Sequence, residues 1–250
     1  MAEQPFDPYY SRGEVSNSDL TALKFALNPQ LNFVKESDKK KAFHLGTLVD
    51  ALVTEPEKCN HYAMTVDDEK YTEKDWKWGL DRLAVLKKQA TKDRFLDFVL
   101  KNAVGQKTFI NPHMKMEYQG FEFELPVRCK FDWWLGEFGG DLKTTAATSQ
   151  EQFEAQIDFV DWDRSRAWYM DLTHSIDPRY GNQDFIFAVS KTKKKVFYKK
   201  IERGDELYLR GREKALEWAF RMCCLLSLLL CQINQNYTII KKRVYAWNSL

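Results

Sequence analysis

The most constraining feature of the sequence is an alternating stretch followed by a tight turn and a second short strand. From residue 127 to residue 134, Val127, Cys129, Phe131 and Trp133 alternate with Arg128, Lys130, Asp132 and Trp134. Alternation with a period of two is typical of a β-strand that buries one face. Gly136 and Glu137 then predict a two-residue type II′ turn, because glycine suits its first central position. The segment is therefore expected to form a hairpin.

The predicted turn places two carboxylates opposite each other. If Leu135 pairs with Phe138, then Asp132 lies opposite Asp141, with Cβ atoms roughly 4.5–5.5 Å apart. Carboxylates at that separation repel each other, and a cation between them would remove the repulsion. Lys143 follows two residues after Asp141 and points to the same face. Two acids and a lysine on one face are what a divalent-metal phosphodiesterase needs, and the alternative is a solvated hairpin with an ordinary ion pair.

The composition predicts a folded, soluble protein. The chain has 250 residues, of which 44% are apolar, so it is long enough for one large domain or two small ones and too apolar for disorder. The net charge of +2 means that any basic surface must be local. The five cysteines lack a metal-binding spacing and the first ten residues lack an apolar leader, which favours a cytoplasmic location with reduced thiols. The apolar run over 222–231 is about half as long as a membrane span, so no membrane partner is expected.

The rest of the chain is predicted to be helical around a strand-rich centre. Ser16 or Ser18 could cap a helix that ends before Pro29, and a second helix would end at Glu55 and Pro56. The expected class is α/β or α+β, with helices packed on a small sheet in a single domain. Its expected parts are a helical region over about 16–104, a sheet core over about 105–203, a helix over about 204–225, and a tail over 226–250 of unknown role.

Five segments occur in an order that resembles a nuclease family. They are residues 15–20 (VSNSDL), 46–56 (GTLVDALVTEP), 130–132 (KFD), 141–145 (DLKTT) and 166–171 (RAWYMD). Together they resemble the RecE-type, exodeoxyribonuclease VIII-like branch of the PD-(D/E)XK nuclease superfamily, whose members occur in phages and prophages. The resemblance runs from about residue 15 to about residue 215. It implies a restriction-endonuclease-like core, in which helices flank a central mixed sheet in the order α-β-β-β-α-β.

The resemblance implies a metal-dependent exonuclease of linear double-stranded DNA. Asp132, Asp141 and the backbone carbonyl of Leu142 would bind Mg²⁺ or Mn²⁺, and Lys143 would orient or activate the attacking water. Hard cations prefer such oxygen ligands, and they lower the pKa of a bound water. The family degrades one strand from its 5′ end and feeds a single-strand annealing protein in recombination. It also implies a bacterial host cytoplasm and a possible ring-shaped homo-oligomer.

Two positions depart from the family pattern. Where the family carries a metal-binding histidine, this sequence has Asp50, which could bind a hard metal, change the metal preference or accompany a loss of activity. Where the family has a glutamine four residues before a tyrosine, the sequence has Ser165, which is too short for the same contact. Tyr169 itself is kept as a catalytic candidate, and Arg164 or Arg166 could contact phosphate instead.

Several alternatives stay open. The lysine-rich run over 191–195 is either a solvated turn or a contact with the DNA backbone, and Trp134 could stack on a base at a strand end. A structure-specific or single-strand endonuclease would use the same chemistry, although the cysteines do not match the iron–sulfur pattern of Cas4-like nucleases. A weakened or inactive DNA-binding subunit, or a purely structural protein, would keep the fold without the reaction.

Overall fold

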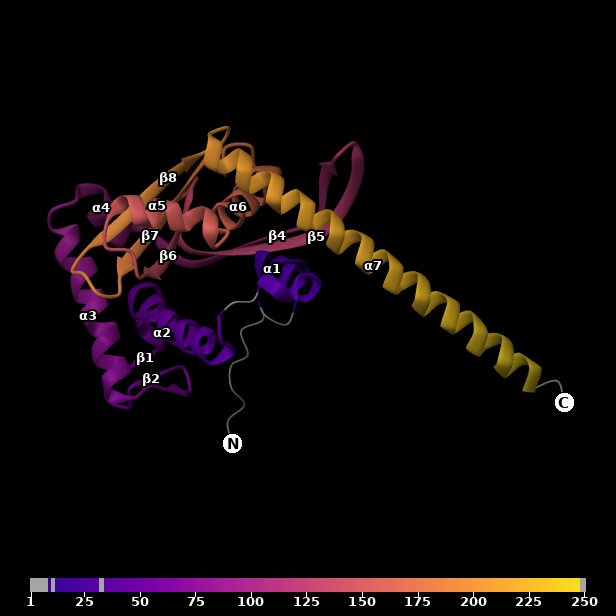
Figure 1. The fold of residues 1–250 in the computed structure, drawn as a ribbon, viewed down its shortest axis with the longest axis horizontal. Coiled ribbons are helices and arrows are strands. Elements are labelled where there is room, and N and C mark those ends of the chain that lie inside the picture. The colour runs from indigo at the N-terminus through magenta and orange to yellow at the C-terminus, as the bar shows by residue number, and fades with distance from the viewer. Residues whose placement is uncertain (1–8, 10–11, 32–33, 248–250) are drawn as a thin grey trace.

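A five-stranded mixed sheet forms the centre of the protein (Figure 1). The computed structural model describes residues 9, 12–31 and 34–247, with side chains described as far as residue 228. The strands lie in the order β4-β5-β6-β7-β8, with β6 parallel to β7 and the other neighbours antiparallel. Their bounds are β4 (Val104–Tyr118), β5 (Phe121–Trp134), β6 (Gly139–Thr145), β7 (Gln183–Ser190) and β8 (Val196–Glu202). The expected α/β class with a mixed sheet is confirmed.

Helices cover both faces of this sheet. Helices α2, α3 and α4 pack on one face, and α5, α6 and α7 pack on the other. Strand β7 is buried on both sides, since Phe185 and Phe187 face the first group of helices while Ile186 and Ala188 face the second, as expected for a central parallel strand. The helices are α1 (Asn17–Leu27), α2 (Glu36–Thr54), α3 (Glu73–Ala90), α4 (Arg94–Asn102), α5 (Gln150–Phe159), α6 (Trp162–Ile176) and α7 (Glu206–Trp247), with 3-10 turns at Pro29–Leu31 and Pro56–Lys58.

Local capping signals fix the starts of two helices. The side chain of Ser16 accepts a hydrogen bond from the Asp19 amide and completes a reciprocal capping box at the start of α1. Ser149 likewise accepts from the Gln152 amide, at 3.3 Å, at the start of α5. The Gln152 side chain accepts from the amide and hydroxyl of Thr148, so a reciprocal capping box with Ser149 is only half formed.

A second, small sheet lies within the region that was expected to be only helical. Strands β1 (Cys59–Asn60), β2 (Thr65–Val66) and β3 (Glu69–Lys70) pair antiparallel between α2 and α3. Val66 and Tyr71 pack there with Leu48, Leu52 and Trp76 in a subsidiary core. This core fixes α2 against α3 beside the main sheet.

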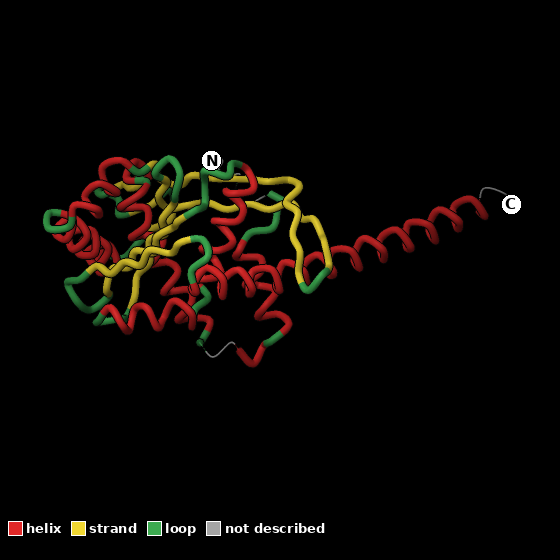
Figure 2. The backbone as a smooth tube through the Cα atoms, turned by 90° about the horizontal axis from the view of Figure 1, so that it is seen from above, coloured by secondary structure: helices red, strands yellow, loops and turns green. Residues whose placement is uncertain are grey.

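The last helix is longer than the sequence pattern predicted. Helix α7 continues without a break to Trp247, through residues that were expected to form a separate tail. Its second half extends away from the body of the protein (Figures 1 and 2). Among the described residues, we find no helix whose length and apolar character would allow it to cross a membrane.

The central hairpin has the register that its turn predicted. Trp133 pairs with Gly140, and the Leu135 amide donates to the Phe138 carbonyl at 2.9 Å. Gly136 has a φ of +83°, which is the left-handed conformation that the first central position of a type II′ turn requires. The pairing between β5 and β6 covers Trp134 with Gly139 and Trp133 with Gly140, and the two predicted carboxylates, Asp132 and Asp141, each lie one residue beyond it.

The alternation predicted for β5 fails at its end. Cys129 and Phe131 lie in the core beneath α6 and α7, but Trp133 packs on the opposite face with α2 and α3. Trp134 lies beside Phe131 instead, with ring centroids 5.1 Å apart. The change coincides with Gln106 on β4, whose φ of +52° interrupts the regular strand geometry. Because Trp134 is only 7% exposed, the prediction that it could stack on a base is wrong.

Gly139 allows a close contact at the start of β6. A Cβ atom at this position would lie 1.9 Å from the Cδ1 atom of Phe131. The Phe131 ring in turn packs edge-on against Tyr169, with centroids 5.0 Å apart. The absence of a side chain at residue 139 therefore sets where this ring lies.

Candidate active site

The predicted site residues line one cleft of about 510 Å³. They come from helix α2, strands β5 and β6, and helix α6, so segments far apart in sequence meet at the cleft. The structure brings together Asp50, Asp132, Asp141, Leu142, Lys143 and Tyr169. Their chemical roles stay predictions, and the geometry below shows what each side chain can do.

Asp141 is the most strongly held carboxylate in the cleft. Lys143 Nζ lies 2.6 Å from its Oδ2 atom, and Arg166 Nη2 donates to its Oδ1 atom at 3.1 Å. Burial alone would raise the pKa of Asp141, but the charges of Arg166 and Lys143 lower it below the ordinary value. The buried Oδ2 atom accepts no well-aligned hydrogen bond, although the Lys143 ammonium lies beside it. Asp141 is therefore an anion with a cation beside each of its two oxygens.

The pKa of Asp132 is shifted in the opposite direction to that of Asp141. The Oδ2 atom of Asp132 accepts a hydrogen bond from the Leu142 amide at 2.6 Å. Burial raises the pKa of Asp132 well above its usual range, and the neighbouring charges of Asp50 and Asp141 raise it further. Of the two acids of the hairpin, Asp132 is therefore the more easily protonated and Asp141 the more easily ionised.

Asp50 reaches the same cleft from helix α2. Gln106 Nε2 donates to its Oδ2 atom at 3.0 Å, and the Thr54 hydroxyl donates to its Oδ1 atom at 3.3 Å. Burial raises the pKa of Asp50 to about 6, against the opposing charge of Lys143 and with the added repulsion of Asp141. Asp50 is therefore close enough to interact electrostatically with both members of the acid–lysine pair on β6.

Arg166 contacts the site from beneath rather than from the cleft. Its Nη1 atom donates to Asp184 Oδ2 at 3.3 Å, in addition to its bond with Asp141. Its guanidinium carbon lies 4.1 Å from the centre of the Tyr169 ring, a cation–π contact. Arg166 is 1% exposed. The prediction that it could contact phosphate is therefore wrong, and its geometry is that of a residue that orients Asp141.

Asp184 is a site residue that the sequence reasoning missed. It is the second residue of the mainly apolar strand β7 and is fully buried. Its pKa is raised to about 7, because burial outweighs the charge of Arg166. A single acid in a strand that reads QDFIFAVS was the available signal, since a buried carboxylate needs a partner. Gln106 was also missed, and no sequence pattern pointed to it.

Ser165 supports its own helix and does not line the cleft. Its hydroxyl donates to the Trp162 carbonyl at 2.8 Å and accepts from Arg166 Nε at 3.3 Å. The residue that replaces the glutamine of the family pattern therefore has a local, structural role.

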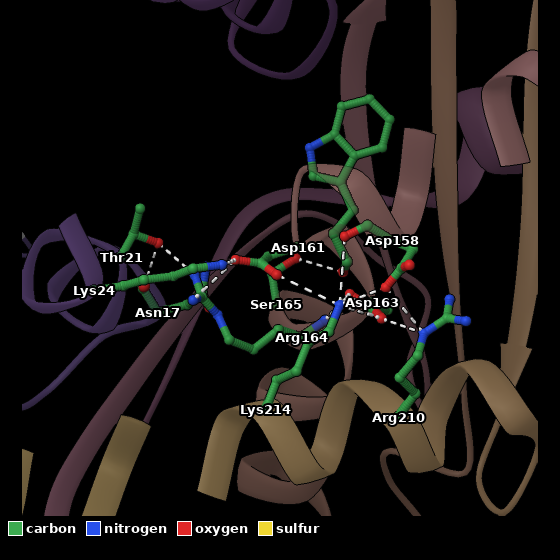
Figure 3. Close-up of polar contacts among 11 residues, drawn as sticks. Asn17, Thr21, Lys24, Asp158, Asp161, Asp163, Arg164, Ser165, Arg210 and Lys214 are labelled. Atoms are coloured by element: carbon green, nitrogen blue, oxygen red, sulfur yellow. Dashed lines mark hydrogen bonds and ion pairs between the residues drawn. The ribbon is translucent and has the colours of Figure 1, made fainter. Parts of the chain in front are cut away.

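Arg164, the other arginine considered for phosphate contact, belongs to a separate polar group (Figure 3). It is 1% exposed, and its Nε atom donates to Asn17 Oδ1 at 3.0 Å. We call this group, which joins α1, the α5–α6 connection and α7, the interhelical cluster. Its charged members are Lys24, Asp158, Asp161, Asp163, Arg164, Arg210 and Lys214. The prediction that Arg164 could contact phosphate is thus also wrong.

Lysines add positive charge around the cleft. Lys130 of β5 and Lys191 of the β7–β8 turn both line it, so one member of the lysine-rich run over 191–195 contributes to the cleft wall. Thr144 lines the cleft as well, whereas Thr145 is buried and donates to Gln156. The cleft lining therefore carries charges of both signs, since Glu55 and Asp67 line it together with Lys58, Lys130 and Lys191.

The donor set of the hairpin fits a hard divalent cation. Asp132 and Asp141 supply carboxylate oxygens, Leu142 supplies a backbone carbonyl nearby, and Asp141 Oδ2 is a buried oxygen that accepts no well-aligned hydrogen bond. Among the described residues, no three His, Cys, Asp or Glu side chains are arranged as a metal-binding group, and Asp50 is held by Gln106 and Thr54. The fit thus rests on the two hairpin carboxylates, and Asp50 is placed beside them.

Comparisons with known proteins add little. No protein-family model and no curated protein matches the sequence. One solved structure that matches is described as "Crystal structure of SSO0001", with a TM-score of 0.33 and 8% sequence identity. The match covers 60% of this chain and 61% of that chain, and a likeness this loose carries no argument about function.

Proposed function

We propose that the protein is a metal-dependent phosphodiesterase that acts on DNA. The observation that carries the proposal is the meeting of Asp132, Asp141 and Lys143 on adjacent strands, in a cleft that Asp50 and Tyr169 also line. The pattern of residues and their order in the chain resemble the RecE-type PD-(D/E)XK nucleases. On that basis we propose an exonuclease of linear double-stranded DNA that digests from the 5′ end.

The side chains divide the chemical work as follows. Asp132, Asp141 and the Leu142 carbonyl would hold Mg²⁺ or Mn²⁺, which when bound neutralises charge at the phosphate and lowers the pKa of a water. Burial lowers the pKa of Lys143, but Asp141 and Asp132 raise it overall. Lys143 therefore stays an ammonium, and its role is to orient the water and to stabilise negative charge on the phosphate.

The margin of the cleft supports a nucleic-acid substrate. Lys130 and Lys191 line the cleft, and in this proposal they would contact the phosphate backbone, with an effect that should weaken as salt is added. Two further parts of the proposal come from the family resemblance. They are the restriction to linear duplex DNA and the supply of single strands to an annealing protein.

A second candidate function is favoured by one observation. Lys143 and Arg166 already neutralise both oxygens of Asp141, so the acid pair is partly balanced without a metal. A DNA-binding subunit that kept the fold but lost the reaction would have this arrangement. Calorimetric titration with Mn²⁺ separates the two, since only the nuclease requires Mn²⁺ binding that depends on Asp132 and Asp141.

The direct test is digestion of linear duplex DNA by the purified protein with Mg²⁺ or Mn²⁺. Lys143→Ala should lower kcat/KM by about 10²–10³-fold, the usual effect of removing one group that stabilises transition-state charge. Lys101→Ala is the matched control, because this lysine lies on the surface of α4 with 68% of its side chain exposed. A closed circular substrate distinguishes exonuclease from endonuclease activity. Digestion that persists in EDTA or in the Lys143 variant contradicts the mechanism.

A further inference from the structure

The outer half of helix α7 continues an apolar stripe that begins on the body of the protein. In the inner half, Leu216 and Ala219 are buried against the core, with exposures of 8% and 0%. Cys223 still packs on the edge of that core. Leu226, the next position on the same stripe, is 38% exposed, since the helix has by then left the body (Figure 2).

The stripe has the spacing of a coiled coil. From Leu226 onwards, apolar residues recur alternately four and three positions apart, which is the a/d pattern of a heptad repeat. Between residues 232 and 236 the remaining positions are all Gln or Asn. The positions of this seam are Leu226, Leu230, Ile233, Tyr237, Ile240, Val244 and Trp247. A strict period of 3.5 residues over three heptads is typical of a helix that packs along another helix rather than on a sheet.

The charges on the helix and the apolar area of the seam indicate which kind of partner can pack on it. No charged residue occurs from 222 to 240, whereas Lys241, Lys242 and Arg243 lie between the seam positions Ile240 and Val244. Two copies of the helix can therefore meet over the first two heptads of the seam without repulsion between like charges. Five aliphatic and two aromatic positions can remove roughly 600–1,100 Å² per chain from water. Two such faces reach the 1,200–2,000 Å² that stable protein interfaces bury.

We propose that the outer half of α7 assembles this protein into a homo-oligomer through a coiled coil of identical helices. The partner is another copy of this chain, because a heptad seam is complementary to itself. Leu230 takes an a position and Ile233 and Ile240 take d positions, a combination that favours three or four strands over two. The assembly brings several clefts together on one scaffold, and it does not depend on nuclease activity.

The test is the mass of the full-length protein in solution, measured by analytical ultracentrifugation without DNA or metal. The wild-type protein should sediment as a multiple of 29.5 kDa. Ile240→Asp places a charge in the seam and should weaken association by at least about 100-fold. The neighbouring Ile239→Asp makes the same chemical change off the seam and should leave the oligomer intact. Circular dichroism and the melting temperature of the body check that both variants fold.

Each outcome decides the proposal. A multiple of the chain mass that is lost in Ile240→Asp and kept in Ile239→Asp supports it. A monomeric wild-type protein overturns it, as does equal dissociation of the two variants. Recovery of the wild-type protein only with detergent also overturns it, because the stripe would then contact lipid rather than another copy.

Discussion

The interhelical cluster and the cleft both gather aspartates inside the protein, but they surround them with different numbers of cations. In the interhelical cluster, three aspartates meet four cations (Figure 3). At the cleft, Asp141 and Asp184 pair with Lys143 and Arg166, and Asp50 and Asp132 lie beside them. The cluster thus has more cations than aspartates, whereas four aspartates at the cleft surround two close cations, and further lysines line its wall.

The pKa values follow this difference. In the cluster, burial tends to raise the pKa of Asp161, but a hydrogen bond from Lys24 and the charge of Arg164 lower it overall. In the cleft, burial and neighbouring acids raise the pKa of Asp50 to about 6 and that of Asp132 well above its usual range. Buried carboxylates thus have a low pKa where cations are built in beside them, and under the proposed function a bound metal would supply further positive charge in the cleft.

The largest expected effect is on the stability of the cluster. Asp163 is fully buried, and Arg210 and Lys214 both lie 3.0 Å from its Oδ2 atom. Asp163→Ala removes the buried acceptor of hydrogen bonds from Arg210, Lys214 and the Arg164 amide, although Arg210 and Lys214 keep Asp158 as a partner. It should lower the free energy of unfolding by about 3–5 kcal/mol, measured by urea denaturation. Mn²⁺ should not reverse the loss. Asp177→Ala, which removes an exposed ion pair with Arg179, should change stability little. A small effect at Asp163 would show that the two regions do not differ as described.

The next effect is stabilisation of the cleft by metal. At a Mn²⁺ concentration 100 times the dissociation constant, the wild-type protein should gain about 2.7 kcal/mol. Asp132→Asn keeps an oxygen for the Leu142 amide but removes the charge, so this variant should gain almost nothing. Asp97→Asn on the surface of α4 is the control. Thermal unfolding with and without Mn²⁺ measures both, and equal gains in Asp132→Asn and wild type would place the metal elsewhere.

The smallest effect is a pH-dependent stabilisation at Asp50. Its pKa is raised to about 6 from an unfolded value of 3.8, so the folded protein holds this proton more tightly than the unfolded chain. The stability that protonated Asp50 supplies is therefore full below about pH 4 and is lost as the pH rises through 6. In metal-free protein, Asp50→Asn should add about 1–2 kcal/mol at pH 8 and nothing at pH 4. A gain that does not depend on pH would show that charge is not the cause.

The hairpin and its register were predictable because their signals are local. Alternation and Gly136 fix which residues pair, and the pairing of Trp133 with Gly140 agrees. The alternation failed at Trp133 and Trp134 because the faces there depend on Gln106, a residue of another strand. The convergence of α2 and α6 on the hairpin was expected only from the family resemblance, since nothing local relates Asp50 to Tyr169.

The environment of Arg166 could not be predicted from its own segment. An arginine in an amphipathic helix is expected to be exposed. It is buried here because its partners Asp141 and Asp184 come from strands 25 and 18 residues away. The extent of α7 was missed for a related reason, since the polar run over 232–236 reads as a loop until the heptad spacing on either side is considered.

The lack of a side chain at Gly139 affects the shape of the cleft through the position of the Phe131 ring. The Phe131 ring fills the space that a methyl group at residue 139 would need, and the same ring supports Tyr169 at the cleft wall. Gly139→Ala would push the ring towards Tyr169 and shift a wall of the site from a position behind it. A substitution at Gly139, which does not line the cleft, would therefore change the cleft indirectly.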